Sequence, residues 1–188
     1  MIGVDEVGRG SWAGPLLVVA ARQTGRLPAG IRDSKLMTRN QRKAIYHLLT
    51  ANYQFGEGWV SPLEIDKHGL AAALKLAVRR AVGDIGAQKA DAIIMDGKVN
   101  YMPLKFSNTS CLIGADNLEP AVSAASICAK IKRDDFMINL AARYPRYGFE
   151  RHVGYGTPEH ANALQAYGAI KSVHRLSFAP IAKIAAKA

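Results

Sequence analysis

Short apolar runs alternate along this chain with longer stretches of helical spacing, and this alternation predicts alternating strands and helices. Residues 1–21 hold two apolar runs separated by Gly8-Arg9-Gly10 and Gly14-Pro15, so we expect two strands with a sharp break between them. The first strand should be central in its sheet, because Ile2 and Val4 lead directly into acidic residues. Further strands are expected near residues 53–60, 92–95 and 111–113.

Helices are predicted where apolar residues recur every three or four positions. Thr38-Arg39-Asn40-Gln41 fits a capping box, and Ser61-Pro62-Leu63-Glu64 is a second helix start with proline at the first helical position. The predicted helices lie near residues 39–50, beyond Pro62 to about residue 81, and at 120–142, 158–167 and 180–187. Because strands and helices alternate, the expected class is α/β or mixed.

Length and composition favour one soluble domain covering residues 1–188. The apolar run near residues 16–21 is far shorter than the roughly 18 residues that span a bilayer. No basic segment followed by an apolar stretch opens the chain, so we expect a cytoplasmic protein. Cys111 and Cys128 form no Cys-x-x-Cys pair and are predicted to be reduced thiols in the core.

The charge balance is strongly basic. The chain has 25 Lys and Arg residues against 15 Asp and Glu, a formal net charge of +10, and a pI near 9.8. Such a balance favours a polyanionic partner, through long-range attraction and the release of counterions. Taken alone it is weak support for nucleic-acid binding, since many basic proteins bind none.

Carboxylates nevertheless stand where apolar, strand-like runs end. Asp5-Glu6 precedes Gly8, Asp96 precedes Gly97, and Asp116 follows Gly114. Strand ends present functional groups in α/β sheets, and carboxylate oxygens are natural ligands of Mg²⁺ or Mn²⁺. Neighbouring side chains of a regular strand point to opposite faces, so Asp5 and Glu6 reach one site only if the strand ends or bulges there. From the residues alone, turn formers and helix caps explain the same acids.

Asp5-Glu6-Val7-Gly8-Arg9-Gly10 with Ala13-Gly14-Pro15 resembles the opening motif of the ribonuclease HII family, and further matches follow in the family's order along nearly the whole chain. They are Asp33-Ser34-Lys35, Asp96-Gly97, Ser123-Ala124-Ala125-Ser126-Ile127, Ala129-Lys130, Arg133-Asp134, Tyr144-Pro145, Tyr147-Gly148-Phe149, His152, Gly154-Tyr155-Gly156-Thr157, His174-Arg175 and Ser177-Phe178. Several motifs in the right order carry more weight than one short match.

The resemblance implies the ribonuclease H-like fold, a mixed central β-sheet flanked by helices, with residues from about 143 to 188 as a small C-terminal helical extension that contacts substrate. It also implies two divalent cations, Mg²⁺ or Mn²⁺, held by Asp5, Glu6, Asp96 and Asp116. Asp116 is the least certain of these acids, because Asp134 and Asp135 lie on the helix that follows it.

The activity implied by the resemblance is that of a metal-dependent endonuclease. It would hydrolyse the RNA strand of RNA·DNA hybrids and cut on the 5′ side of ribonucleotides embedded in duplex DNA, leaving 5′-phosphate and 3′-hydroxyl ends. Its role would be to remove misincorporated ribonucleotides and RNA primers. We expect a monomer, and residues 177–188 lack the glutamine and paired aromatics of a sliding-clamp motif.

The same resemblance implies nucleic-acid contacts. Gly8-Arg9-Gly10 would approach the target ribonucleotide and read its 2′-hydroxyl, which a backbone without Cβ atoms can do at short range. Tyr155 would pack against the deoxyribose that follows, although a core aromatic in a glycine-rich turn is the alternative. Lys35, Lys130 and Arg146 are candidates for phosphate contacts, with plain surface charge equally open.

Several features depart from the family pattern or fit no role. Leu36 and Val153 stand where lysines are usual, which puts affinity rather than chemistry in question. His47, His68 and His160 are predicted to be helix-surface or capping residues, and no histidine is assigned as a metal ligand. The rival functions are a ribonuclease HIII-like hybrid nuclease without junction activity, a catalytically silent nucleic-acid-binding module, and a nuclease that acts on DNA alone.

Overall fold

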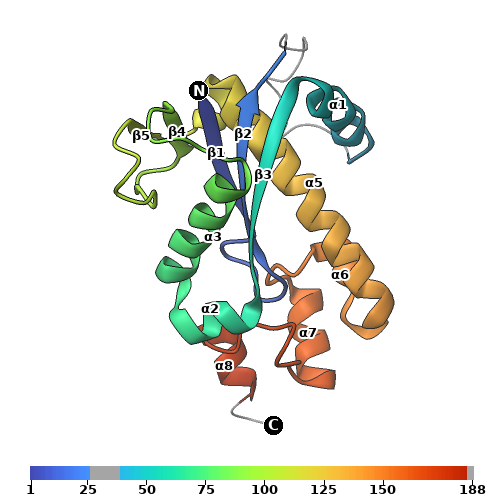
Figure 1. Ribbon diagram of the computed structural model, residues 1–188. Coiled ribbons are helices and arrows are strands. Elements are labelled where there is room, and N and C mark those ends of the chain that lie inside the picture. Colours follow the sequence, from blue (N-terminus) through green and yellow to red (C-terminus); the bar gives the residue numbers. More distant parts are fainter. Residues whose placement is uncertain (26–38, 186–188) are drawn as a thin grey trace. The chain divides into compact units, whose positions relative to one another are not determined.

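The computed structural model describes residues 1–25 and 39–185, and these residues form two compact units (Figure 1). Unit 1 comprises Met1–Val7, Leu17–Trp59 and Leu74–Ile131, and unit 2 comprises Gly8–Leu16, Val60–Ala73 and Lys132–Ala188. Thr38, Lys35 and Leu36, which figure in the sequence predictions, lie outside the described residues. In the described part of the chain, no helix is long and apolar enough to cross a membrane.

A five-stranded mixed sheet runs in the order β3-β2-β1-β4-β5, and all but the ends of two strands belong to unit 1. The strands are β1 (Ile2–Val7), β2 (Leu16–Gln23), β3 (Tyr53–Val60), β4 (Ile93–Asp96) and β5 (Thr109–Leu112). β1 pairs antiparallel with β2 and parallel with β4, and β4 pairs parallel with β5. The prediction that the first strand is central is confirmed.

Of the two alternatives predicted for Asp5-Glu6, a strand end or a bulge, a bulge is absent, and β1 continues one residue past them to Val7. β1 pairs with β2 without interruption from Ile2↔Arg22 to Val7↔Leu17, so its alternation continues through both acids. On the other side, pairing with β4 stops at Val4↔Met95. The strand therefore stays regular because β2 supports it, and its acidic end is open only toward β4.

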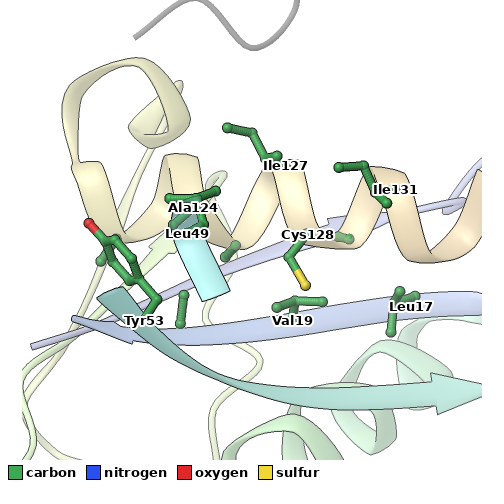
Figure 2. Close-up of a cluster of buried hydrophobic side chains, with 12 residues drawn as sticks. Leu17, Val19, Leu49, Tyr53, Ala124, Ile127, Cys128 and Ile131 are labelled. Carbon is green, nitrogen blue, oxygen red and sulfur yellow. The ribbon is translucent and has the colours of Figure 1, made fainter. Parts of the chain in front are cut away.

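Helices α1 (Arg39–Asn52) and α4 (Ala115–Leu118) belong to unit 1, and α3 (Leu70–Asp84) and α5 (Pro120–Arg143) contribute to both units. Figure 2 shows α5 lying along β2, with the Cys128 side chain pointing toward Val19, and Ile127 and Ile131 belong to the same buried cluster. Cys128 is buried in this core as predicted, whereas Cys111 is only partly buried because β5 is an edge strand.

The closest approach in unit 1 is between backbones. A Cβ atom on Gly3 of β1 would lie 2.2 Å from the carbonyl carbon of Ala121 and from the amide nitrogen of Val122. On the other side of the sheet, a Cβ atom on Gly58 of β3 would lie 1.9 Å from the carbonyl oxygen of Ala77 in α3. These glycines let both helices pack directly on the sheet.

Unit 2 is built from short helices around its own apolar core. They are α2 (Pro62–His68), the 3-10 turn η2 (Pro145–Tyr147), α6 (Phe149–His152), α7 (Pro158–Tyr167) and α8 (Ala179–Ala185). The Ser61 capping box of α2 is confirmed: the Glu64 amide donates to Ser61 Oγ at 3.3 Å, and the Ser61 amide donates to Glu64 Oε2 at 2.9 Å. The single turns α4, η2 and α6 were not predicted, because four residues or fewer leave no helical period to detect.

The substitution Gly3→Ala is expected to lower the free energy of unfolding by about 3 kcal/mol, because the new methyl group must displace the α5 backbone. Gly83→Ala is the matched control. A Cβ there meets nothing within 4 Å, and alanine in the last turn of α3 should stabilise the protein by up to about 0.5 kcal/mol. Urea unfolding followed by circular dichroism measures both. Equal effects of the two substitutions would contradict the backbone contact.

Candidate active site and nucleic-acid-binding elements

Three of the four predicted acidic residues lie near the carboxyl ends of two neighbouring strands of unit 1. β1 and β4 are parallel neighbours, so Asp5 and Glu6 follow the Val4↔Met95 pair on one strand and Asp96 follows it on the other. Asp96 Oδ1 accepts a hydrogen bond from the amide of Ala115 at 2.9 Å, which ties the end of β4 to the start of α4. Asp116 is the next residue of α4. This bond favours Asp116 over Asp134 and Asp135, which belong to unit 2.

Asp5 is the most perturbed of these acids. Burial raises the pKa of its carboxyl group to about 7, and the negative charges of Glu6 and Asp96 add to the increase. Hydrogen bonds from Ser126 and from the Glu6 amide, the latter 2.8 Å long, work against it. A carboxylate in this environment is stabilised by a proton or by a cation.

The donor set fits a hard divalent cation in its chemistry, since all four side chains offer carboxylate oxygens. The positions of these side chains, however, do not form a complete metal site. Among residues 1–25 and 39–185, no three acidic, histidine or cysteine side chains lie close enough to share a metal ion. Asp116 is buried, and its Oδ1 accepts a hydrogen bond from Asn117 at 3.1 Å. The four-ligand set therefore stays a prediction that requires side-chain rotation.

The Gly8-Arg9-Gly10 segment belongs to unit 2 and contains two different kinds of glycine. Gly8 is buried with φ +81°, and a Cβ there would lie 2.1 Å from Arg133 Nε. Arg9 and Gly10 are exposed, and a Cβ on Gly10 meets nothing within 4 Å. The fold thus requires glycine at position 8 but not at position 10.

Tyr155 is 37% exposed, which argues against the alternative of a core aromatic. Its amide donates to the His152 carbonyl at 2.9 Å, and its own carbonyl accepts from the Thr157 amide at 2.9 Å and contacts His160 Nδ1 at 3.0 Å. The Arg133 guanidinium lies over its ring at 5.5 Å from the centroid. The backbone of this residue is therefore fixed while part of the side chain remains accessible.

The candidate phosphate contacts are dispersed. Lys130 is half-buried on the unit 1 part of α5, and Arg146 is exposed in unit 2 with its guanidinium 5.4 Å from the centroid of the Tyr167 ring. Lys35 lies outside the described residues. Contact of these side chains with phosphate stays a prediction.

Sequence reasoning gave no role to two arginines that are fully buried in unit 2, Arg133 and Arg175. Their guanidinium groups donate to main-chain carbonyls of the loop that contains Gly8-Arg9-Gly10. A signal was present for Arg133, because it lies one helical turn before Met137 on the apolar face of α5.

Three histidines of unit 2 are also buried: His152, His160 and His174. The prediction that His160 is a helix-surface or capping residue is wrong, because its ring stacks on His152 at 4.5 Å between centroids and packs against Phe149 and His174. Burial lowers the pKa values of His160 and His174 to about 4. These two rings are therefore neutral at physiological pH.

The chain is similar to known proteins in sequence and in fold. The sequence model of the family described as Ribonuclease HII matches residues 2–181. The Ribonuclease HII of Thermosynechococcus vestitus is 42% identical over 185 residues, covering 95% of this chain and 83% of that protein. Ribonuclease H2 from Pyrococcus horikoshii OT3 has a TM-score of 0.78 at 24% identity, covering 99% of this chain and 97% of that one. Bst-RNase HIII in complex with Mn²⁺ has a TM-score of 0.72 at 22% identity, covering 99% of this chain and 69% of that one. The predicted fold class is confirmed.

His174 is expected to lower the stability of the protein as the pH drops from 7.5 to 5, because its ring becomes protonated in the unfolded chain but stays neutral in the folded one. Its folded-state pKa is depressed below the unfolded value near 6.5, so its contribution is present above that value and is lost as the pH falls toward 4. His174→Gln should therefore reduce the loss between pH 7.5 and 5 by about 2 kcal/mol. Denaturant unfolding at both pH values measures this difference. The exposed control His47→Gln should leave the loss unchanged, and an unchanged loss in His174→Gln would refute the expectation.

Proposed function

The chain belongs to the ribonuclease HII family and is a ribonuclease H enzyme, and from this premise we propose that it cuts on the 5′ side of ribonucleotides embedded in duplex DNA as well as within RNA·DNA hybrids. The observation that carries the proposal is the shared edge of β1 and β4, where Asp5, Glu6 and Asp96 interact electrostatically. The role of the protein in this proposal is the removal of misincorporated ribonucleotides and RNA primers.

The reaction uses two divalent cations, Mg²⁺ or Mn²⁺, held by Asp5, Glu6, Asp96 and Asp116. When bound, such cations supply the charge that lowers the pKa of an attacking water and stabilises the departing 3′ oxygen. The raised pKa of Asp5 supports this assignment, because burial and the neighbouring negative charges destabilise its carboxylate, and a bound cation relieves this in place of the proton. The products carry 5′-phosphate and 3′-hydroxyl ends.

The protein groups hold and orient these ligands. The Ser126 hydroxyl and the Glu6 amide donate to the Asp5 carboxylate and restrict its rotation. The Ala115 amide restricts Asp96 in the same way. A carboxylate oxygen that accepts one hydrogen bond keeps a further lone pair, so these bonds are compatible with binding of a cation.

Unit 2 supplies substrate contacts in this proposal. Gly8-Arg9-Gly10 reads the 2′-hydroxyl, and the exposed Gly10, which internal packing does not require to be glycine, supports close approach of a sugar. Tyr155 packs against the following deoxyribose with its accessible ring. Lys35, Lys130 and Arg146 bind phosphates, and the net charge of +10 favours the encounter with the duplex.

Replacement of Asp96 by asparagine should reduce metal-dependent cleavage of a DNA duplex with one ribonucleotide by roughly 100-fold or more, because it removes a charged ligand at the reacting phosphate. The matched control is Asp91→Asn in the same unit, where the carboxylate pairs with Arg22 at 2.8 Å on the surface. Cleavage of an end-labelled duplex with Mg²⁺ or Mn²⁺ measures both. If Asp96→Asn cut as well as Asp91→Asn, the metal assignment would be wrong.

Gly10→Ala should leave the free energy of unfolding within about 0.5 kcal/mol of wild type, because the new methyl group meets no protein atom. It should nevertheless lower kcat/KM for the ribonucleotide-containing duplex by about tenfold or more, because the methyl group stands between the loop and the sugar. Gly8→Ala is the contrast, since it should destabilise the protein itself. Full activity in a folded Gly10→Ala variant would count against ribose reading by this loop.

A further inference from the structure

Arg133 and Arg175 are buried cations whose hydrogen bonds, within the described residues, go to main-chain carbonyls. Arg133 donates from Nε to Pro15 at 2.9 Å, from one terminal nitrogen to Ala13 at 3.1 Å, and from the other to Val153 at 2.9 Å. Arg175 donates twice to Gly14, at 3.1 and 3.0 Å, and once to Arg9 at 2.9 Å. Burial of a charge on carbonyl dipoles is costly unless the geometry is close to ideal.

The backbone is strained at one of the residues that Arg133 contacts. Val153 has φ +43°, a conformation that β-branched residues rarely adopt, and its carbonyl is the one that Arg133 holds. The next residue, Gly154, accepts hydrogen bonds from the amides of Trp12 and Ala13 at 2.8 and 3.1 Å. The turn before Tyr155 is thus bound to the loop before Pro15 by main-chain bonds and by one guanidinium.

Arg133 also contacts the side chain of Tyr155, with 5.5 Å between the guanidinium carbon and the ring centroid. One planar group therefore fixes the loop that follows Gly8-Arg9-Gly10 and the ring of Tyr155 together. Arg175 holds the same loop, but its hydrogen bonds do not reach the 153–155 turn, and its ring contact is with Phe178 at 5.2 Å. The charge of each arginine interacts with Tyr155, but the ring contact with Tyr155 and the hydrogen bond to the 153–155 turn belong to Arg133.

We propose that Arg133 is a positioning residue that couples the Gly8-Arg9-Gly10 loop to Tyr155, so that reading of the ribose and contact with the following nucleotide act as one unit. The inference rests on the proposed function, because it assigns a common support to two substrate contacts proposed there. It predicts that the contribution of Tyr155 to substrate binding depends on the guanidinium fork of Arg133 and is independent of that of Arg175.

The test is a set of equilibrium binding measurements in EDTA, where cleavage is absent. Fluorescence anisotropy at one salt concentration gives the Kd for a DNA duplex with one ribonucleotide and for the same duplex without it. Tyr155→Leu is introduced into wild type, Arg133→Lys and Arg175→Lys. Lysine keeps the charge and removes the fork, so a change in long-range attraction is excluded.

Tyr155→Leu is expected to weaken binding of the ribonucleotide duplex by roughly tenfold in wild type and in Arg175→Lys, but by less than about twofold in Arg133→Lys. An equal loss in all three backgrounds overturns the inference. If Arg133→Lys is unfolded by circular dichroism, Gly10→Ala and Tyr155→Leu are combined instead. The double variant should then lose about as much affinity as the weaker-binding single variant, and multiplication of the two losses overturns the inference.

Failure of the proposed function has a separate signature. A wild-type protein that binds both duplexes equally and does not cut the ribonucleotide duplex with Mg²⁺ or Mn²⁺ overturns the proposed function and the inference with it. A wild-type protein that prefers and cuts the ribonucleotide duplex, yet shows the same Tyr155→Leu effect in Arg133→Lys, overturns the inference alone.

Discussion

The contact between the Gly3 position of β1 and the backbone of α5 at Ala121-Val122 fixes the geometry on which the acidic site depends. Asp5 lies two residues beyond Gly3, on the same face of the strand, and Ser126 lies one helical turn beyond Val122. The hydrogen bond from Ser126 to Asp5 therefore depends on the alignment of β1 with α5 that the close packing at Gly3 sets. Since no side chain separates strand and helix there, neither can slide along the other without breaking this bond.

The two units bury groups of opposite charge. Unit 1 gathers carboxylates until the pKa of Asp5 rises to about 7, so its acidic edge favours binding of a cation or a proton. Unit 2 buries two guanidinium groups, and burial together with the charge of Arg133 lowers the pKa of Arg175 to about 9. The buried rings of His160 and His174 in the same unit stay neutral and add no charge.

Much of this architecture could be predicted from the sequence, because its signals are periodic or conformational. The strands follow from apolar runs, α5 from helical spacing, α2 from Ser61 and Glu64, and the acidic edge from acids beside glycines. What escaped prediction breaks the rule that polar and charged side chains lie outside. Arg133, Arg175 and His160 are buried because loop carbonyls and neighbouring rings, far away in the sequence, receive them. The regular course of β1 past Asp5 was also missed, because strand pairing is a property of β2 as much as of β1.

The connection from β1 to β2 also has a fixed length. Surface loops between strands usually accept inserted residues. Here the Val7↔Leu17 pair fixes both ends of the connection. Within it, the guanidinium groups of Arg133 and Arg175 donate hydrogen bonds to the carbonyls of Arg9, Ala13, Gly14 and Pro15. One added residue would move those carbonyls away from their donors or shift the strand register, which would turn each core side chain of β2 outward. The length of this loop is therefore as constrained as the glycine at position 8, which marks the loop as part of the framework of the fold.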